Sequence, residues 1–226
     1  MQDEPPVGEP VDGPDARSPG RRRIEGTHVT LRPLEPTNDA EPLWVAAHDG
    51  SDEATRLWTY MPYGPFSDVG EMRRWLEGSA PSEDPLFLAV VGRDAGPVGV
   101  VSFLNVDVTH RRLELGHIWY APSAQRTEAN TESTYLMLRE AFERLGHRRV
   151  EWKCDALNER SRAAALRLGF TFEGIFRNHM IVKGRNRDTA WFAMTVQEWP
   201  SAARAFQRWL SAAPGERPAL ASLRGS

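Results

Sequence analysis

The sequence has little cysteine and no long apolar segment. Its 226 residues include a single cysteine, Cys154, which excludes an intrachain disulfide and fits a reducing compartment. No apolar run approaches the roughly 18 residues that a membrane-spanning helix needs. Residues 1–23 contain no apolar stretch of the kind found in secretory signals. We therefore expect a cytoplasmic protein without a membrane partner.

An excess of charge of one sign is also absent. The 28 Lys and Arg residues against 31 Asp and Glu residues leave a formal net charge of -3. Domains that bind nucleic acids are usually basic overall or on one face, so we expect no nucleic-acid partner. The basic run at residues 21–23 leaves open the alternative of an adaptor that contacts an acidic partner. No group of His, Cys and Asp residues has metal-ligand spacing, and we expect no metal.

The composition predicts one folded domain between two tails. Hydrophobic residues make up 40% of the chain, enough for a packed core. Residues 1–23 are rich in Pro, Gly and charged residues and are expected to be a disordered tail. Residues 24–200 are expected to form the domain. Residues 201–226 are expected to be a terminal helix followed by a frayed tail.

Hydrophobic periodicity indicates alternating strands and helices. The expected strands are 28–33, 86–91, 98–106, 113–120, 149–154, 170–176 and 189–196. The expected helices are 39–48, 67–76, 129–145, 158–168 and 201–210, whereas residues 51–66 are expected to be irregular. This order predicts a mixed α/β fold, with helices on both sides of one sheet.

A strand, a polar loop and a long helix follow one another across residues 113–145. A loop that enters a helix N-terminus presents free amides and the positive end of the helix dipole, which together attract anions. A pyrophosphate would suit this position, with Arg126, Thr127 and Thr131 as further donors and Asn130 or Thr131 as the helix cap. The alternative is an ordinary capped helix without a ligand.

The helix at residues 158–168 carries a serine that capping does not explain. Asn158 is a suitable N-cap, and Gly169 is suited to the left-handed conformation that ends a helix. Ser161 lies in the first turn, where its hydroxyl would either bond back to the cap or face a cleft.

Four segments in this order resemble the GNAT superfamily of N-acetyltransferases, and within it the ribosomal-protein (alanine/serine) N-acetyltransferase branch. They read LRPLEPTNDAEPL, LELGHIWYAPSAQRTEANTESTYLMLREAFERLG, RRVEWKCDALNERSRAAALRLGFTFEGIFRNHMI and RDTAWFAMTVQEWP, and they cover most of residues 24–200. The resemblance implies the acyl-CoA N-acyltransferase fold: a twisted, mostly antiparallel sheet whose fourth and fifth strands, at 113–120 and 149–154, splay apart.

The resemblance also implies acetyl-CoA as co-substrate, held without a metal. The implied cofactor-binding residues are Ile118, Trp119, Tyr120, Gln125, Arg126, Thr127, Glu128, Ala129, Asn130, Thr131, Asn158 and Ser161. The family's loop, Q/R-x-x-G-x-G/A, aligns with residues 125–130, where its two glycines are replaced by Glu128 and Asn130. Glu128 places a carboxylate near an expected anion site.

The catalytic residues are implied in the same way. The tyrosine that many members use to protonate the leaving thiolate is Ala165 here, and the ribosomal-protein branch uses a serine at the position of Ser161. Glu114 and His179 are the candidate bases, with Glu114 ranked first. Strand alternation places His117, a third candidate, on the opposite face from Glu114. For Glu114, an ion pair with Arg111 or Arg112 is the structural alternative.

The expected reaction is direct acetyl transfer to a primary amine in a ternary complex. The acceptor would be a protein N-terminus or a small amine, and Trp58, Tyr60, Tyr63 and His117 are the expected acceptor-binding residues. Packing of a lid is the alternative role for these aromatic residues. A module that binds an acyl-CoA without turnover is the alternative function. A homodimer is possible, with the terminal helix carrying Phe206 and Trp209 as its contact.

Overall fold

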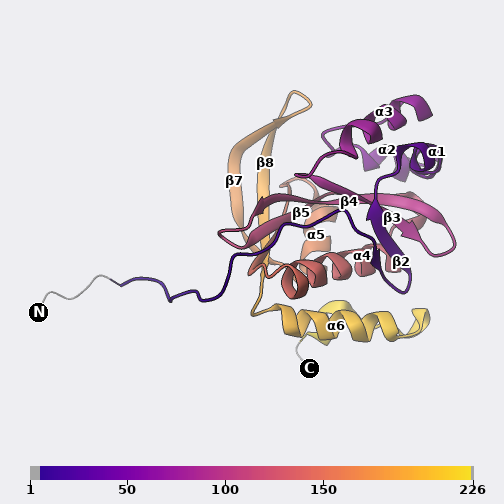
Figure 1. Cartoon of the computed structure of the whole chain (residues 1–226). Helices are drawn as coiled ribbons and strands as arrows, with labels where there is room; N and C mark the ends of the chain where they lie inside the picture. Colours follow the sequence, from indigo (N-terminus) through magenta and orange to yellow (C-terminus); the bar gives the residue numbers. More distant parts are fainter. Residues whose placement is uncertain (1–5, 225–226) are drawn as a thin grey trace, which may run out of the picture.

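A single eight-stranded sheet organises the chain (Figure 1). The computed structural model describes residues 6–224. The strands are β1 (Ile24–Glu25), β2 (Val29–Pro33), β3 (Leu86–Gly92), β4 (Gly96–Asp107), β5 (Arg112–Tyr120), β6 (Arg149–Asp155), β7 (Thr171–Val182) and β8 (Arg185–Thr195), in the order β1-β2-β3-β4-β5-β6-β8-β7. The helices are α1 (Pro36–Ala47), α2 (Asp52–Leu57), α3 (Val69–Ser79), α4 (Glu128–Arg139), α5 (Glu159–Leu168) and α6 (Trp199–Ser211). The predicted mixed α/β fold is confirmed.

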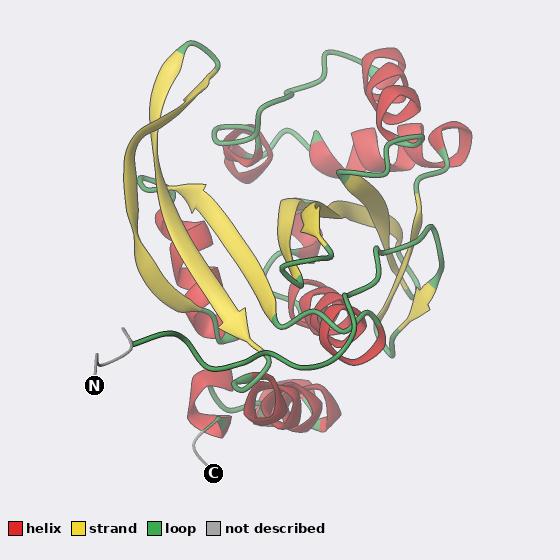
Figure 2. Ribbon diagram, turned by 60° about the vertical axis from the view of Figure 1, so that its left-hand side comes forward, coloured by secondary structure: helices red, strands yellow, loops and turns green. Residues whose placement is uncertain are grey.

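The pairing between β5 and β6 is parallel and short. It runs from Arg112 opposite Arg149 to Leu115 opposite Trp152, and all the other strand pairs are antiparallel. Residues 116–120 of β5 have no strand partner on the side of β6. Figure 2 shows the β6–β8–β7 half of the sheet diverging from the other half. The predicted splay of these two strands is therefore confirmed.

Helices bury both faces of the sheet (Figure 1). In β3, Leu88 and Val90 join the core covered by α4, α5 and α6, whereas Phe87 and Ala89 join a second core beneath α1 and α3. Strands buried on both faces lose the alternation of polar and apolar residues, which explains the continuous apolar run in β3. Each helix within residues 6–224 is too short or too polar to span a bilayer.

Several element boundaries differ from those predicted. Ser51 caps α2 within the stretch expected to be irregular, because its Oγ accepts the amide of Ala54 at 3.1 Å. The β7–β8 hairpin is longer than expected because its tip is exposed and has no periodic apolar signal. Thr127, rather than Asn130 or Thr131, caps α4.

A β-bulge in β5 changes which side chains share a face. Register moves from Ser102 opposite Gly116 to Val100 opposite Trp119, so the bulge places two β5 residues opposite one on β4. His117 lies at the bulge with a left-handed φ of 50°. Strand alternation consequently fails here: His117 packs on the face of the second core, with Glu114, and the prediction that it lies opposite Glu114 is wrong.

Both expected tails contact the domain. The amide of Ala16 donates to Val108 O at 3.0 Å, and that of Arg17 donates to Leu145 O at 2.8 Å. Arg22 of the basic run pairs with Glu140 at 3.4 Å. At the other end, Leu220 and Leu223 are buried in the main core. Phe206 is also fully buried within the chain, which removes it as the suggested dimer contact.

A buried carboxylate on α4 holds the start of β2. Glu132 accepts the backbone amides of Thr27, His28 and Val29 at 2.7, 2.6 and 2.7 Å. A Cβ at Gly26 would lie 2.7 Å from this carboxylate, so only glycine fits there. Amides that donate to an ionised carboxylate make stronger hydrogen bonds than neutral pairs. Glu132 therefore fixes the edge of the sheet to the helix beneath it.

Replacing Glu132 with glutamine tests this link. Glu132→Gln removes the charge and one acceptor oxygen, leaving a buried amide short of a partner, and we expect the free energy of unfolding to fall by about 2 kcal/mol. Urea unfolding measures the loss. Glu77→Gln, an exposed site on α3, is the matched control and should change stability little. Equal losses in the two variants would contradict the role given to Glu132.

Candidate active site

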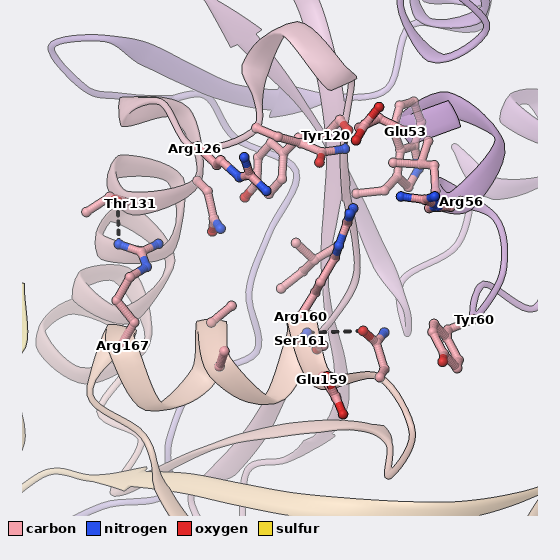
Figure 3. Close-up of a pocket in the computed structure, with 18 of the residues that line it drawn as sticks. Glu53, Arg56, Tyr60, Tyr120, Arg126, Thr131, Glu159, Arg160, Ser161 and Arg167 are labelled. Atoms are coloured by element: carbon pink, nitrogen blue, oxygen red, sulfur yellow. Dashed lines mark hydrogen bonds between the residues drawn. The ribbon is translucent and has the colours of Figure 1, made fainter. Parts of the chain in front are cut away.

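The gap between β5 and β6 opens into a cavity of about 910 Å³ (Figure 3). This volume is typical of pockets that bind small molecules. Its wall includes these residues singled out from the sequence: Tyr60, Ile118, Trp119, Tyr120, Gln125, Arg126, Thr127, Asn130, Thr131, Asn158 and Ser161. The structure thus gathers most of the expected cofactor-binding residues around one space. The other residues to which the sequence pointed lie outside this cavity wall.

The loop after β5 delivers a helix N-terminus to this cavity. Thr127 Oγ1 accepts the amide of Ala129 at 3.2 Å and donates to Ala124 O at 2.8 Å, which orders the turn into α4. Arg126 adopts a left-handed φ of 61° just before the helix. The positive end of the α4 dipole therefore faces the cavity beside Asn130, and such a position favours an anion.

Arg167 adds a cation that the sequence analysis missed. Its Nη1 donates to Thr131 Oγ1 at 3.0 Å, and among the described residues it has no carboxylate partner (Figure 3). Burial lowers the pKa of Arg167. Helical spacing could have pointed to Arg167 in the sequence. It lies on one helix face with Arg160, Ala163 and Ala164, and all four residues line the cavity. A partly buried guanidinium that lacks a carboxylate partner among the described residues favours a ligand with a negative charge.

Glu128 does not face the cavity. Its carboxylate forms an ion pair with the guanidinium of Arg217, and this contact lowers the pKa of Glu128. Ala129 is likewise absent from the cavity wall. The negative charge that replaces the family's glycine is thus matched by a cation from the C-terminal segment.

Ser161 lies in the first turn of α5, at the edge of the gap. Asn158 Oδ1 accepts the Ser161 amide at 3.1 Å, so Asn158 caps the helix as expected. Trp152 Nε1 donates to Ser161 Oγ at 3.0 Å, so the serine hydroxyl can still donate its own proton, and the Cys154 sulfur is one neighbouring acceptor. Burial raises the pKa of the neighbouring Cys154 thiol, with Ser161 opposing the shift. Ser161 therefore brings a hydroxyl donor to the cavity wall, next to a buried thiol that does not itself line the cavity.

Glu114 is buried on the other face of the sheet, beside β6. Its Oε2 lies 2.8 Å from Lys153 Nζ and accepts Asn105 Nδ2 at 2.7 Å. Burial raises the pKa of Glu114, with Lys153 opposing the shift. The alternative pairing with Arg111 or Arg112 is wrong: Arg112 contacts other carboxylates instead.

The aromatic residues expected on the acceptor side pack mainly into the second core. Trp58 is buried against Trp119, with ring centroids 5.3 Å apart. Tyr63 stacks on His117 at 5.7 Å, and burial lowers the pKa of His117 to about 4. Of this group, only Tyr60 lines the cavity, where its hydroxyl donates to Leu157 O at 3.0 Å. Trp58, Tyr63 and His117 therefore have the packing role that the sequence left open as the alternative.

The β7–β8 hairpin carries His179 to the same face as Glu114. His179 Nδ1 lies 3.0 Å from Thr189 Oγ1, and its ring centroid is 5.9 Å from that of Trp191. Lys153 Nζ lies 5.4 Å from the centroid of the same Trp191 ring, so Trp191 and Lys153 together connect His179 to Glu114. Lys183 at the hairpin tip donates to Trp58 O at 2.9 Å and to Gly64 O at 2.8 Å. Within residues 6–224, no group of three His, Cys, Asp or Glu residues could hold a metal ion.

Comparisons with known proteins agree with this geometry. The family model described as "Acetyltransferase (GNAT) domain" matches residues 28–171. A curated Bacillus subtilis protein, "Putative ribosomal N-acetyltransferase YdaF", is 28% identical over 178 residues, 76% of this chain and 93% of its own length. A GCN5-related N-acetyltransferase from Brucella melitensis has a TM-score of 0.90 at 36% identity, covering 95% of this chain and 99% of its own.

A more distant structure shares the fold. The microcin C7 self-immunity acetyltransferase MccE, solved with acetyl-CoA and AMP, has a TM-score of 0.65 at 23% identity, with 75% of this chain and 93% of its own covered.

The half-buried His117 predicts acid sensitivity. Its pKa of about 4 lies below the ordinary value of 6.5, so the unfolded chain binds the proton first as pH falls. The free energy of unfolding should fall between pH 6.5 and pH 4, by up to about 3 kcal/mol from this group. His117→Asn, which tolerates the left-handed φ, should flatten that fall in denaturant titrations at each pH. His110→Asn, an exposed control, should not; an unchanged slope in His117→Asn contradicts the assignment.

Proposed function

The chain belongs to the GNAT acetyltransferase family, and we propose on that basis that it transfers the acetyl group of acetyl-CoA to a primary amine. The observation that carries this proposal is the meeting of three features at one cavity: the gap between β5 and β6, the α4 N-terminus, and Ser161. Each suits a different part of acetyl-CoA.

The residues at the cavity fit the co-substrate from end to end. The unpaired edge of β5 at residues 118–120 suits the amide-containing pantetheine arm, which can hydrogen-bond to it as an added strand does. The α4 N-terminus with Asn130 suits the pyrophosphate, and Arg167 suits a phosphate charge. The MccE structure supports acetyl-CoA as a ligand of this fold.

Ser161 is proposed to protonate the leaving sulfur. The bound thioester supplies the acetyl group, and the amine nitrogen forms the new C–N bond as the C–S bond breaks. Ser161 Oγ accepts from Trp152, so its own proton can point into the cavity toward the thiolate. Cys154 cannot readily act as a nucleophile because burial raises its pKa, which favours direct transfer over an acetylated cysteine.

Glu114 is proposed to accept the proton of the ammonium nucleophile, through water. A buried carboxylate with a raised pKa is a better base than an exposed one at neutral pH. Its Oε1 is free of the contacts that Lys153 and Asn105 make to Oε2. His179, connected to Glu114 through Trp191 and Lys153, is the second candidate for the base. His117 is disfavoured as the base because its own pKa is low.

We propose a protein N-terminus as the acceptor, and the name of the curated relative, "Putative ribosomal N-acetyltransferase YdaF", supports an acceptor associated with the ribosome. A small amine is the alternative. We propose that the reaction takes place in the cytoplasm. The test is release of CoA thiol from acetyl-CoA with a panel of N-terminal peptides and small amines. Acetyl-CoA binding without thiol release for any amine would instead identify a binding module.

Ser161→Ala tests the thiolate acid. We expect kcat to fall about tenfold to a hundredfold with little change in the KM for acetyl-CoA, because the lost proton donor acts only as the thiolate forms. Steady-state thiol release measures both constants. Ser123→Ala is the control, since Ser123 is exposed and does not line the cavity. Wild-type kcat in Ser161→Ala would remove Ser161 from the mechanism.

Glu114→Gln tests the base through the pH dependence of the rate. The base acts deprotonated, so activity should rise with pH through a pKa above the ordinary 4.5 of a glutamate. Glu114→Gln should lower kcat about a hundredfold and abolish this acid limb. His179→Ala should keep the limb. The opposite pattern, with the limb lost only in His179→Ala, would transfer the role to His179.

A further inference from the structure

We propose that the C-terminal segment, residues 199–224, forms a subsite for the nucleotide end of CoA. The inference rests on the proposed function, because it concerns how the same cavity holds its co-substrate. The segment lies outside the matched family region, which ends at residue 171. It nevertheless supplies part of the cavity wall, through Trp209, Pro218, Ala219 and Leu220.

The position of this wall matches the nucleotide end of the ligand. Trp209 and Leu220 line the same cavity as Thr131 and Arg167, on the side of the α4 N-terminus proposed for the pyrophosphate. The indole ring of Trp209, which is only partly buried, offers apolar surface against which a purine can stack, and aromatic stacking of a base contributes substantially to binding. Arg167 offers a positive charge beside that surface for a phosphate of the nucleotide.

An ion pair holds the wall in place. The Arg217 guanidinium pairs with Glu128 in the first turn of α4, and it lies 4.5 Å from the ring centroid of Trp209. Arg217 Nε also donates to Ala212 O at 3.2 Å. Arg217 is largely buried, so its contact with Glu128 is shielded from water. Glu128, which replaces a glycine of the family's loop, thus ties the pyrophosphate loop to the C-terminal segment.

The far end of the segment is tied to α5. Arg224 Nη2 donates to Leu166 O at 3.1 Å, and its carbonyl accepts Ser201 Oγ at 2.6 Å. Leu220 and Leu223 are buried in the main core between these contacts. The wall is therefore anchored at both ends and preorganised for a ligand, which lowers the entropic cost of binding.

Two acetyl donors distinguish binding at this subsite from binding in the rest of the cavity. Acetyl-CoA carries the nucleotide, whereas S-acetyl-4′-phosphopantetheine lacks it. We expect Arg217→Ala to raise the Kd of acetyl-CoA about tenfold and to leave the Kd of the truncated donor within about twofold, because only the nucleotide reaches the wall. Calorimetry measures the first Kd, and NMR titration measures the weaker one. Arg204→Ala, exposed on α6 and away from the cavity, is the matched control.

A charge reversal keeps the test independent of folding. Glu128→Lys alone should weaken acetyl-CoA binding, and Glu128→Lys with Arg217→Glu should restore much of it by re-forming the pair. Equal acetyl-CoA affinity in wild type and Arg217→Ala, or equal losses for both donors, overturns the subsite and leaves the proposed function standing. Failure of the unaltered chain to bind acetyl-CoA overturns the proposed function itself.

Discussion

The short parallel pairing of β5 with β6 is the constraint on which the site depends. The two strands share hydrogen bonds only as far as Leu115 and Trp152, and beyond them β5 keeps one unpaired edge inside the protein. Buried backbone groups need partners, so this edge is favourable only beside a ligand or water that can hydrogen-bond to it. The bulge at His117 increases the local bend of β5 and turns Glu114 and His117 to one face.

Around this gap, three parts of the chain converge that are distant in sequence. The loop after β5 brings the α4 N-terminus, α5 brings Ser161 and Arg167, and the C-terminal segment closes one side. Each is held by a specific polar contact, such as Trp152 to Ser161 or Arg217 to Glu128. The parts that form the cavity are thus held in fixed positions relative to one another, which would suit the proposed positioning of two reactants.

Local patterns predicted much of this arrangement. Hydrophobic periodicity and caps located the strands and most helices. The family resemblance of the ordered segments predicted the splayed pair, and most of the residues it named for the cofactor line one cavity. The remaining features depend on contacts between residues distant in sequence, which local patterns do not reveal. The bulge at His117 has no signal in the composition, and α2 is too short to show helical periodicity. Glu128 was expected to disfavour a nearby anion, because the sequence does not reveal its ion pair with the C-terminal segment. The pairing of Glu114 with Lys153 likewise depends on strand register.

A crystal structure of the chain with bound CoA tests the central claim most directly. The account predicts the pantetheine arm along residues 116–120 of β5, the pyrophosphate at the α4 N-terminus, and the thiol within hydrogen-bonding reach of Ser161 Oγ. CoA bound elsewhere, with β5 and β6 closed over the gap or the thiol remote from Ser161, would contradict it.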